Sequence, residues 1–292
     1  MKTTYEITAL STGKTLLEYV EGYELGKPKI SLLFHEKRIA VNGHFEKSSY
    51  SLKSGDIVSI DVDETIDFTP DVKKLDILYE DDYILAVNKP AHILVHPDQK
   101  DKRGTMCNIV AYYYQNRDWS YQIRYAHRLD MDTTGVLLFA KDILTLAKLD
   151  AMIRTHELKR TYLCLALGKF KEKQGTIDAP IGEDRHHQQR KRISKTGKRA
   201  VTHYEVLKEF SKYSLVRVQL ETGRTHQIRV HFASIGHPLL GDALYGENRI
   251  PAPRVMLHSY EATFIHPVLR KEITIQKNIP YDMKQFIERK AL

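Results

Sequence analysis

The chain has 292 residues, of which 42% are hydrophobic and 28% are charged, and its formal net charge is +8. This composition is typical of a soluble globular protein of about two domains and excludes a largely disordered chain. No apolar run approaches the roughly 18 residues of a membrane helix, and the N-terminus lacks a basic region followed by an apolar core, so we expect neither a membrane span nor a secretory signal. The two cysteines, Cys107 and Cys164, are too few for a disulfide framework or a four-cysteine zinc site, which favours a reducing cytoplasm.

The positive charge belongs to the larger, C-terminal part of the chain. Residues 1–75 contain 10 Lys and Arg against 12 Asp and Glu, a net charge of −2, whereas residues 76–292 contain 35 against 25, a net charge of +10. A basic surface of this kind attracts anions, and nucleic acid is the first candidate partner.

Residues 1–70 are expected to form a small α/β unit, which ends within a polar linker at 64–75 that contains Pro70. The expected order is helix, helix, hairpin, strand: helices at 14–20 and 29–35, a hairpin at Asn42-Gly43 and a strand after the turn Ser54-Gly55-Asp56.

Residues 76–292 are expected to form a second, larger domain. Strands are indicated at 81–90, 135–142, 161–168 and 213–223, and residues 143–157 are free of Gly and Pro and long enough for a helix. Strands in hairpin-like succession with interspersed helices predict an α+β fold with a mainly antiparallel sheet and flanking helices.

The segment 185–199 contains seven Lys and Arg and no acidic residue. Its only apolar residue is Ile193, so we expect an exposed loop. Such a loop is either merely solvated or an arm that contacts phosphates. The charge asymmetry favours the arm, with Arg190, Lys191 and Arg192 as its candidate contacts.

Two stretches combine charged side chains with scaffold elements. In residues 125–142, His127, Arg128, Asp130 and Asp132 precede an apolar strand, a pattern that indicates either an ordinary turn or a site on a rigid edge.

In residues 220–246, a helix is expected at 226–235, with Thr225 as its cap and Gly236 and Pro238 at its end. Arg224 and Arg229 then lie near the positive end of the helix dipole, which favours a nearby anion such as Asp130 or a phosphate.

Metal and nucleotide motifs are missing from the sequence. The chain has 14 His but no HExxH pattern and no paired CxxC, and it contains no Walker A, GxGxxG or GxSxG sequence. We therefore expect no metal site, and neither a nucleotide-binding loop nor a hydrolase nucleophile elbow has support in the sequence.

The run HRLDMDTTG at 127–135 resembles the HRLDxxTSG motif of RluA-type pseudouridine synthases, with Thr134 in place of the usual Ser. The resemblance covers essentially all of residues 76–292. Four further stretches carry it in order: 77–97, the Lys-x-Tyr segment at 159–168, 222–246 and 257–267. Residues 1–70 resemble the RNA-binding module named after ribosomal protein S-four, although their net charge of −2 departs from the basic surface expected of such a module.

The resemblance implies an isomerase that converts uridine in RNA to pseudouridine without metal or cofactor. It implies that Asp130 is the essential carboxylate, which attacks carbon six of uracil or the anomeric carbon of the sugar, or acts as a base there. It also implies that Arg229 pairs with Asp130 and that Tyr162 stacks on the target base. RNA contacts are implied for His127 and Arg128, and Arg224 is expected to contact flanking phosphates. Ribosomal RNA is favoured over transfer RNA, and a monomer is expected.

Two other functions stay open at this point. One is a non-catalytic RNA-binding or ribosome-assembly factor on the same fold, which would be free to lose Asp130. The other is a metal-dependent phosphoesterase using Asp130, Asp132 and a nearby His, which lacks the usual ligand spacing.

Overall fold

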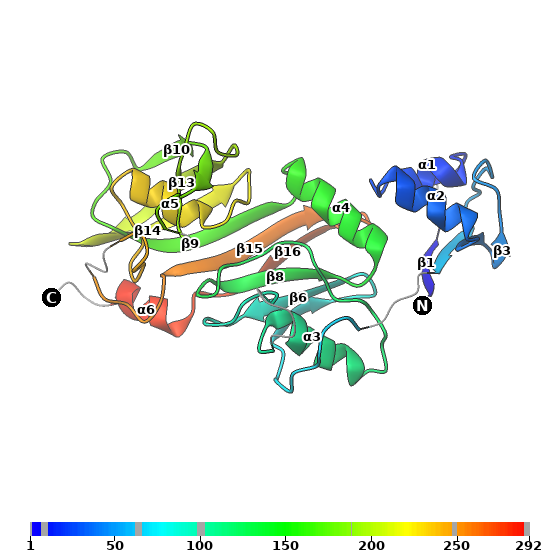
Figure 1. Cartoon of the computed structure of the whole chain (residues 1–292), viewed down its shortest axis with the longest axis horizontal. Coiled ribbons are helices and arrows are strands. Elements are labelled where there is room, and N and C mark those ends of the chain that lie inside the picture. Colours follow the sequence, from blue (N-terminus) through cyan, green and yellow to red (C-terminus); the bar gives the residue numbers. More distant parts are fainter. Residues whose placement is uncertain are drawn as a thin grey trace.

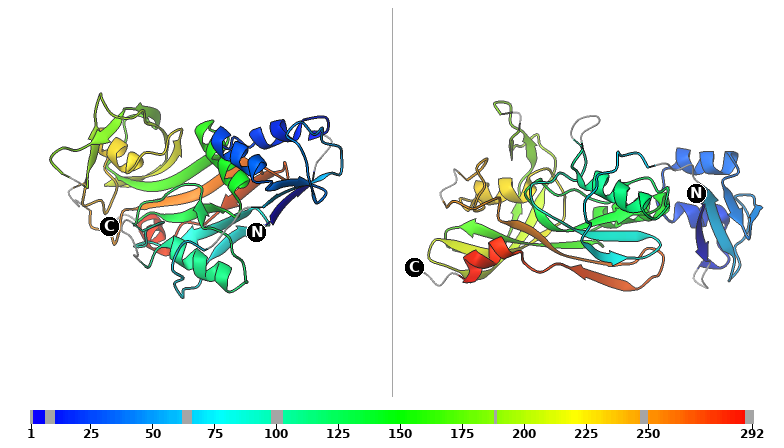
Figure 2. Two further views of the ribbon diagram at one scale, coloured as in Figure 1. Left: turned by 45° about the vertical axis from the view of Figure 1, so that its right-hand side comes forward. Right: turned by 90° about the horizontal axis from the view of Figure 1, so that it is seen from below.

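The computed structural model describes residues 2–6, 11–61, 66–97, 103–187, 189–246 and 250–288. A small four-stranded sheet with two helices lies at one end of a long ten-stranded sheet (Figure 1). The two further views in Figure 2 show the same end-to-end arrangement. None of the described helices is long and apolar enough to cross a membrane.

The small sheet has the strand order β1-β4-β2-β3, and all its pairs are antiparallel. Its elements are β1 (Lys2–Glu6), α1 (Leu16–Glu21), α2 (Lys27–His35), β2 (Ile39–Val41), β3 (His44–Phe45) and β4 (Ile57–Asp61). Helix α1 begins with a capping box, in which the Thr15 hydroxyl accepts from the Glu18 N–H and the Glu18 carboxylate accepts from the Thr15 N–H. The predicted order of helix, helix, hairpin, strand is confirmed, and β1 is an additional strand.

The small unit is packed against the larger body. Leu144, near the start of α4 (Ile143–Arg154), belongs to the same buried cluster as Leu16 and Val20 of α1. Part of the expected linker at 64–75 lies outside the described residues, and Ile66 and Phe68 pack against the core of the larger sheet.

The large sheet has the order β10-β13-β14-β9-β15-β8-β6-β5, with β16 added to β15 and β7 to β8. All its pairs are antiparallel except β15 with β8. Its strands are β5 (Ile77–Glu80), β6 (Ile84–Lys89), β7 (Arg124–Tyr125), β8 (Thr134–Ala140), β9 (Lys159–Leu167), β10 (Gln174–Asp178), β13 (Val201–Glu209), β14 (Tyr213–Leu220), β15 (Leu257–Ile265) and β16 (Glu272–Gln276). Besides α4, its helices are α3 (Met106–Gln115), α5 (Gln227–Ser234) and α6 (Tyr281–Glu288). The expected mainly antiparallel sheet with flanking helices is confirmed.

Strand β9 is the centre of this body and is buried on both faces. Tyr162 and Cys164 share a buried cluster with Phe232 of α5, whereas Leu163 and Leu165 share another with Met283 of α6. The strictly alternating side chains of β9 therefore point into two different cores.

Two local predictions are wrong. Thr225 does not cap α5: the N-cap residue is His226, which has a left-handed backbone (φ 57°) and makes no capping hydrogen bond. The preceding turn is held by Gln227 instead, whose side-chain oxygen accepts hydrogen bonds from the Thr222 hydroxyl and the Arg224 N–H. The predicted end of the helix at Gly236 is confirmed, with φ +82° at that glycine.

The segment 185–199 is not simply a loop. Its residues Lys191–Ile193 form β12, which pairs antiparallel with β11 (Ile181–Glu183). The prediction missed this hairpin because the segment is polar on both faces, and the partner strand lies in a different stretch of the sequence.

Candidate active site

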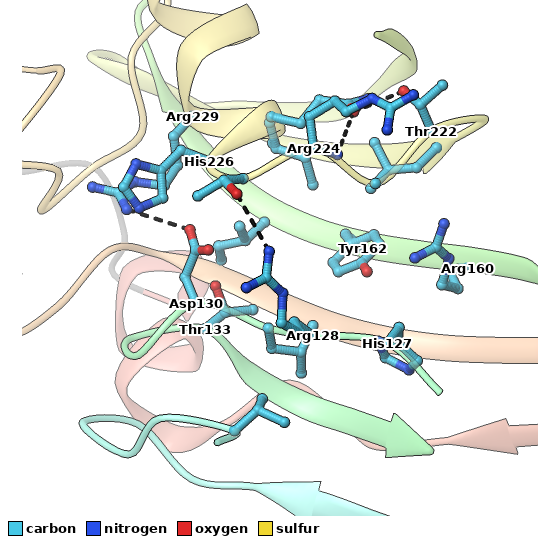
Figure 3. Close-up of a pocket in the computed structure, with 18 of the residues that line it drawn as sticks. His127, Arg128, Asp130, Thr133, Arg160, Tyr162, Thr222, Arg224, His226 and Arg229 are labelled. Atoms are coloured by element: carbon cyan, nitrogen blue, oxygen red, sulfur yellow. Dashed lines mark hydrogen bonds and ion pairs between the residues drawn. The ribbon is translucent and has the colours of Figure 1, made fainter. Parts of the chain in front are cut away.

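A cleft of about 1370 Å³ lies over the middle of the large sheet, where the loop between β7 and β8 faces β9 and the N-terminal end of α5 (Figure 3). It brings together residues from Leu94 to Leu257, which are 163 positions apart in the sequence. The predicted site residues that line it are His127, Arg128, Asp130, Tyr162, Lys191, Arg224 and Arg229. Arg190 and Arg192 do not line it.

Asp130 and Arg229 form an ion pair on one side of this cleft. The Arg229 Nη1 lies 3.3 Å from Oδ2 of Asp130. The same guanidinium donates from Nε (2.7 Å) and Nη2 (2.9 Å) to the two oxygens of Asp242, whose side chain has no exposed surface. Burial opposes the charge of Arg229, but its bonds to Asp242 and the charge of both carboxylates outweigh this and raise its pKa. Asp242 therefore fixes the arginine, and the arginine presents its remaining nitrogen to Asp130.

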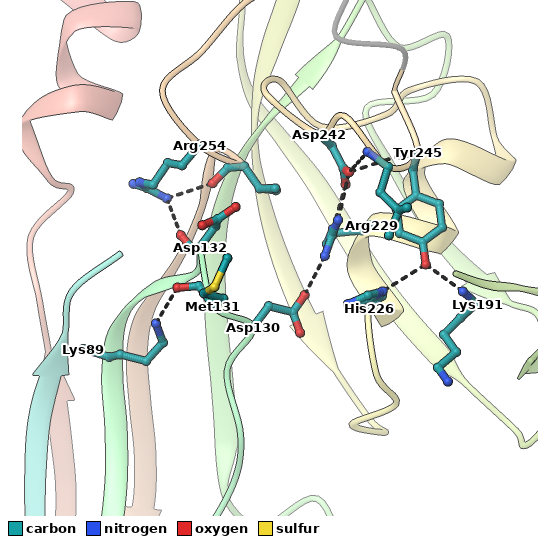
Figure 4. A network of polar contacts seen from close by, with 12 residues as sticks. Lys89, Asp130, Met131, Asp132, Lys191, His226, Arg229, Asp242, Tyr245 and Arg254 are labelled. Carbon is teal, nitrogen blue, oxygen red and sulfur yellow. Dashed lines mark hydrogen bonds and ion pairs between the residues drawn. The ribbon is translucent and has the colours of Figure 1, made fainter. Parts of the chain in front are cut away.

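The loop that carries Asp130 is held by two buried cations (Figure 4). The Lys89 ammonium donates to the carbonyl oxygens of Pro90, Ile93 and Met131 at 2.6–2.9 Å. Arg254 donates to the carbonyl oxygen of Asp132 at 3.1 Å. Burial lowers the pKa of Lys89 to about 7, against the opposing charges of Asp130 and Asp132. The backbone of Met131 and Asp132, the two residues that follow Asp130, is thus held from below by Lys89 and Arg254.

The strand that follows the loop depends on a glycine and a hydroxyl. Gly135 has φ +107°, and a Cβ there would lie 2.1 Å from the carbonyl oxygen of Ser259, so only glycine permits β8 and β15 to meet. The Thr134 hydroxyl lies 2.8 Å from Nδ1 of His258, and Nε2 of that ring lies 2.9 Å from the carbonyl oxygen of Lys277. Burial lowers the pKa of His258 to about 4, so the neutral ring donates from Nε2 and accepts the Thr134 hydroxyl at Nδ1.

Tyr245 joins α5 to the basic hairpin. Its hydroxyl accepts from the Lys191 N–H (2.8 Å) and lies 3.0 Å from Nδ1 of His226. The Arg229 guanidinium lies 5.1 Å from the centre of its ring. Burial raises the pKa of Tyr245 and lowers that of His226. This tyrosine therefore supports the arginine that faces Asp130.

The remaining cleft residues divide into buried and exposed groups. Tyr162 is only 4% exposed, and burial raises the pKa of its hydroxyl. Arg128 is exposed, with Nη2 3.4 Å from the Thr225 hydroxyl, and Arg224 is exposed, with Nε donating to the carbonyl oxygen of Arg199. The two exposed arginines lie at the rim, where a large polyanion can reach them.

The three arm residues differ from one another. Lys191 forms an ion pair with Glu183, and Arg190 lies over the Tyr245 ring at 5.4 Å from its centre. Arg192 is exposed to solvent. The arm therefore offers less unpaired charge than its sequence indicates.

Four residues of the site were missed by the sequence reasoning: Lys89, Asp242, Tyr245 and Arg254. Lys89 had a signal, since it is a lysine at the end of an apolar strand and directly before a proline. The other three lie in loops where nothing in the local pattern marks burial. Among the described residues, no group of three or more His, Cys, Asp or Glu is placed to hold a metal ion.

Comparisons with known proteins find RNA pseudouridine synthases at the level of family, sequence and structure. Residues 83–234 match the family described as RNA pseudouridylate synthase. The chain is 44% identical over 262 residues to the uncharacterized RNA pseudouridine synthase YhcT of Bacillus subtilis, covering 88% of this chain and 87% of that protein. It is 36% identical to ribosomal large subunit pseudouridine synthase D of Salmonella typhimurium, covering 94% and 89%. Among solved structures, it is similar to human RNA pseudouridylate synthase domain containing 1, with a TM-score of 0.58, 26% identity, and coverage of 72% and 86%.

Proposed function

The chain belongs to the RluA-type RNA pseudouridine synthases and is an isomerase, and on that premise we propose that Asp130 is its catalytic carboxylate. The observation that carries this proposal is the ion pair in the cleft. Arg229 engages Oδ2 of Asp130, while no hydrogen bond to Oδ1 occurs within the described part of the chain. One oxygen is thus anchored beside a cation and the other is available to react.

The reaction needs four events at the target nucleotide. The N1–C1′ bond breaks, the uracil turns, C5 bonds to C1′, and the proton on C5 leaves. Asp130 attacks C6 of the base or C1′ of the sugar, or removes a proton there, and Arg229 stabilises its charge throughout. The Tyr162 ring stacks on the uracil while it turns, and its hydroxyl lies within the same cleft to assist the proton step.

The exposed arginines of the rim are assigned to RNA binding. A uridine within folded RNA has to leave its stack to reach Asp130, which costs a few kcal/mol. Arg128 contacts the extruded nucleotide or the space it leaves, and Arg224 and Arg192 contact flanking phosphates. Their exposed positions support these roles.

The substrate we propose is ribosomal RNA of the large subunit, modified by a monomer in the cytoplasm. Several relatives that this chain matches over 89% of their own length are named ribosomal large subunit pseudouridine synthase D, which supports this choice over transfer RNA. Residues 1–70 form an S-four-like unit of this enzyme, and residues 76–292 form its catalytic domain. The net charge of −2 in the first 75 residues favours a weak RNA contact by the small unit.

The test is tritium release from RNA that carries label on carbon five of its uridines, prepared from a strain lacking this protein. Isomerisation expels that label. Wild-type protein should release it, and Asp130→Asn should reduce release at least about 10³-fold while folding and RNA affinity are kept. Appreciable turnover by the Asp130→Asn variant would refute the assignment of Asp130. Release from transfer RNA but not from ribosomal RNA would overturn the substrate assignment alone.

A further inference from the structure

Six Lys and Arg side chains are buried in the described part of the chain, and five of them are bonded there to carboxylate or carbonyl oxygens. The partners are carboxylates or carbonyl oxygens: Glu80 for Lys141, Asp242 for Arg229, Asp282 for Arg254, Gln122 for Arg124, and three backbone carbonyls for Lys89. The sixth is Arg160 on β9. It is 5% exposed, forms no ion pair among the described residues, and its Nε–H has no hydrogen-bond partner there; its side-chain partner is the neutral Tyr162 hydroxyl, which supplies no counter-charge.

His127 lies close to Arg160, and no side chain is bonded to its ring. It is 8% exposed, and neither ring nitrogen has a hydrogen-bond partner in the described structure. Burial and the charge of Arg160 lower the pKa of His127 to about 3, so the ring is neutral and offers one N–H donor and one acceptor. The unpartnered Nε–H of a buried guanidinium beside a buried imidazole that no side chain engages is unusual in a folded protein and calls for a ligand.

Both side chains line the cleft next to Tyr162 (Figure 3). Residues 160 and 162 are two apart on one strand, so they point to the same face, about 7 Å from each other. Above the guanidinium lies Gly223, where a Cβ would be 3.4 Å from Nη1 and 3.7 Å from Nη2 of Arg160. The lack of a side chain at this position keeps the guanidinium reachable from the cleft.

We propose that Arg160 and His127 form a binding site for one backbone phosphate of the RNA, adjacent to the uridine that stacks on Tyr162. This rests on the proposed function only in placing RNA in the cleft. A buried guanidinium without a carboxylate needs an anion, and the phosphate is the anionic group of RNA. The planar fork of Arg160 matches two phosphate oxygens, and the neutral imidazole donates one further hydrogen bond.

The test compares Arg160→Gln with Lys159→Gln in an Asp130→Asn background, in which RNA binds without turnover. Lys159 is the preceding residue, carries the same charge, and is exposed outside the cleft. The probe is a transcript of large-subunit ribosomal RNA, and its Kd is measured by filter binding over a series of KCl concentrations. Arg160→Gln should weaken binding about tenfold and lower the slope of log K against log salt by about 0.7–0.9, the value for one phosphate contact. Lys159→Gln should leave both unchanged.

Thermal unfolding separates a binding role from a structural one. Removing a buried charge that has no carboxylate partner among the described residues should keep or raise the Tm of Arg160→Gln, whereas loss of a structural arginine lowers it. A lowered Tm, an unchanged salt slope, or equal effects of Arg160→Gln and Lys159→Gln would each overturn the phosphate site. The role of Asp130 is judged by turnover and not by affinity, so the two proposals fail independently.

Discussion

At one side of the cleft a buried arginine lies between two carboxylates, and at the other side a buried arginine has no carboxylate partner in the described part of the chain. Arg229 is bound by Asp242 and Asp130, whereas Arg160 lies beside two neutral groups, the His127 ring and the Tyr162 hydroxyl. Tyr162 lies between the two sides (Figure 3). The two arginines therefore differ in how their charge is neutralised. The charge of Arg229 is neutralised within the free protein, whereas that of Arg160 is proposed to be neutralised only when RNA binds.

The difference follows from what each side has to do. A group that stabilises charge during a reaction is most effective when its orientation is fixed beforehand, and the contacts of Asp242 fix Arg229. A group that binds substrate gains most when its partner arrives with the substrate. If Arg160 binds a phosphate as proposed, its lack of a carboxylate partner would cost stability in the free protein and would contribute affinity once the phosphate is bound.

The largest expected effect on stability comes from breaking the ion pair between Arg229 and Asp242. Asp242→Asn leaves Arg229 buried with only its 3.3 Å contact to Asp130, so the free energy of unfolding should fall by about 3–5 kcal/mol. Isomerisation should fall as well, because the guanidinium is free to turn. Urea unfolding and tritium release measure the two effects.

The control for Asp242→Asn is an exposed ion pair on the same sheet. Arg217 and Glu205 lie 2.9 Å apart and are about half exposed, so Glu205→Gln should cost less than about 1 kcal/mol. If the two variants lost similar amounts of stability, the contrast between the side of the cleft where carboxylates hold Arg229 and the side where Arg160 has no carboxylate would lose its support.

Tyr162 tests the region between the two sides. Tyr162→Phe keeps the ring that stacks on the base and removes the buried hydroxyl, so RNA affinity should stay within about twofold and isomerisation should fall about 10²-fold. Tyr162→Leu removes the stacking ring and should weaken binding by about 1–3 kcal/mol as well. Filter binding and tritium release separate the two losses. Full activity of Tyr162→Phe would restrict this residue to stacking.

The fold was predictable where local chemistry decides it. The Asn42-Gly43 turn, the apolar run of β8 and the helix end at Gly236 each carry their own signal, and the structure has all three. The hairpin of β11 and β12 was not predictable, because its pairing depends on Glu183 and Lys191 meeting from separate segments.

Sequence motifs pointed to the residues of the site, but not to the residues that hold them in place. The sequence pattern pointed to Asp130, Tyr162 and Arg229, and the cleft contains all three; their roles stay proposals. Asp242 was missed because it lies in an unmarked loop, and Thr225 was wrongly expected to cap α5. The sequence could not show that Arg160 lacks a carboxylate partner, because this depends on which carboxylates the folded chain brings near it.

The smallest effect concerns His127 and is visible only in the pH dependence of stability. Its pKa is about 3 in the folded protein and about 6.5 when unfolded, so between these values the unfolded chain holds one proton more. Stability should therefore fall with decreasing pH across this window, by up to about 1.4 kcal/mol per pH unit for one proton. His127→Asn should remove this slope from urea unfolding between pH 6 and pH 4.5. His258, whose pKa is lowered to about 4, keeps its own contribution in that variant and serves as the internal reference. An unchanged slope would mean that His127 gains a compensating partner on protonation. The proposed phosphate site would then rest on Arg160 alone.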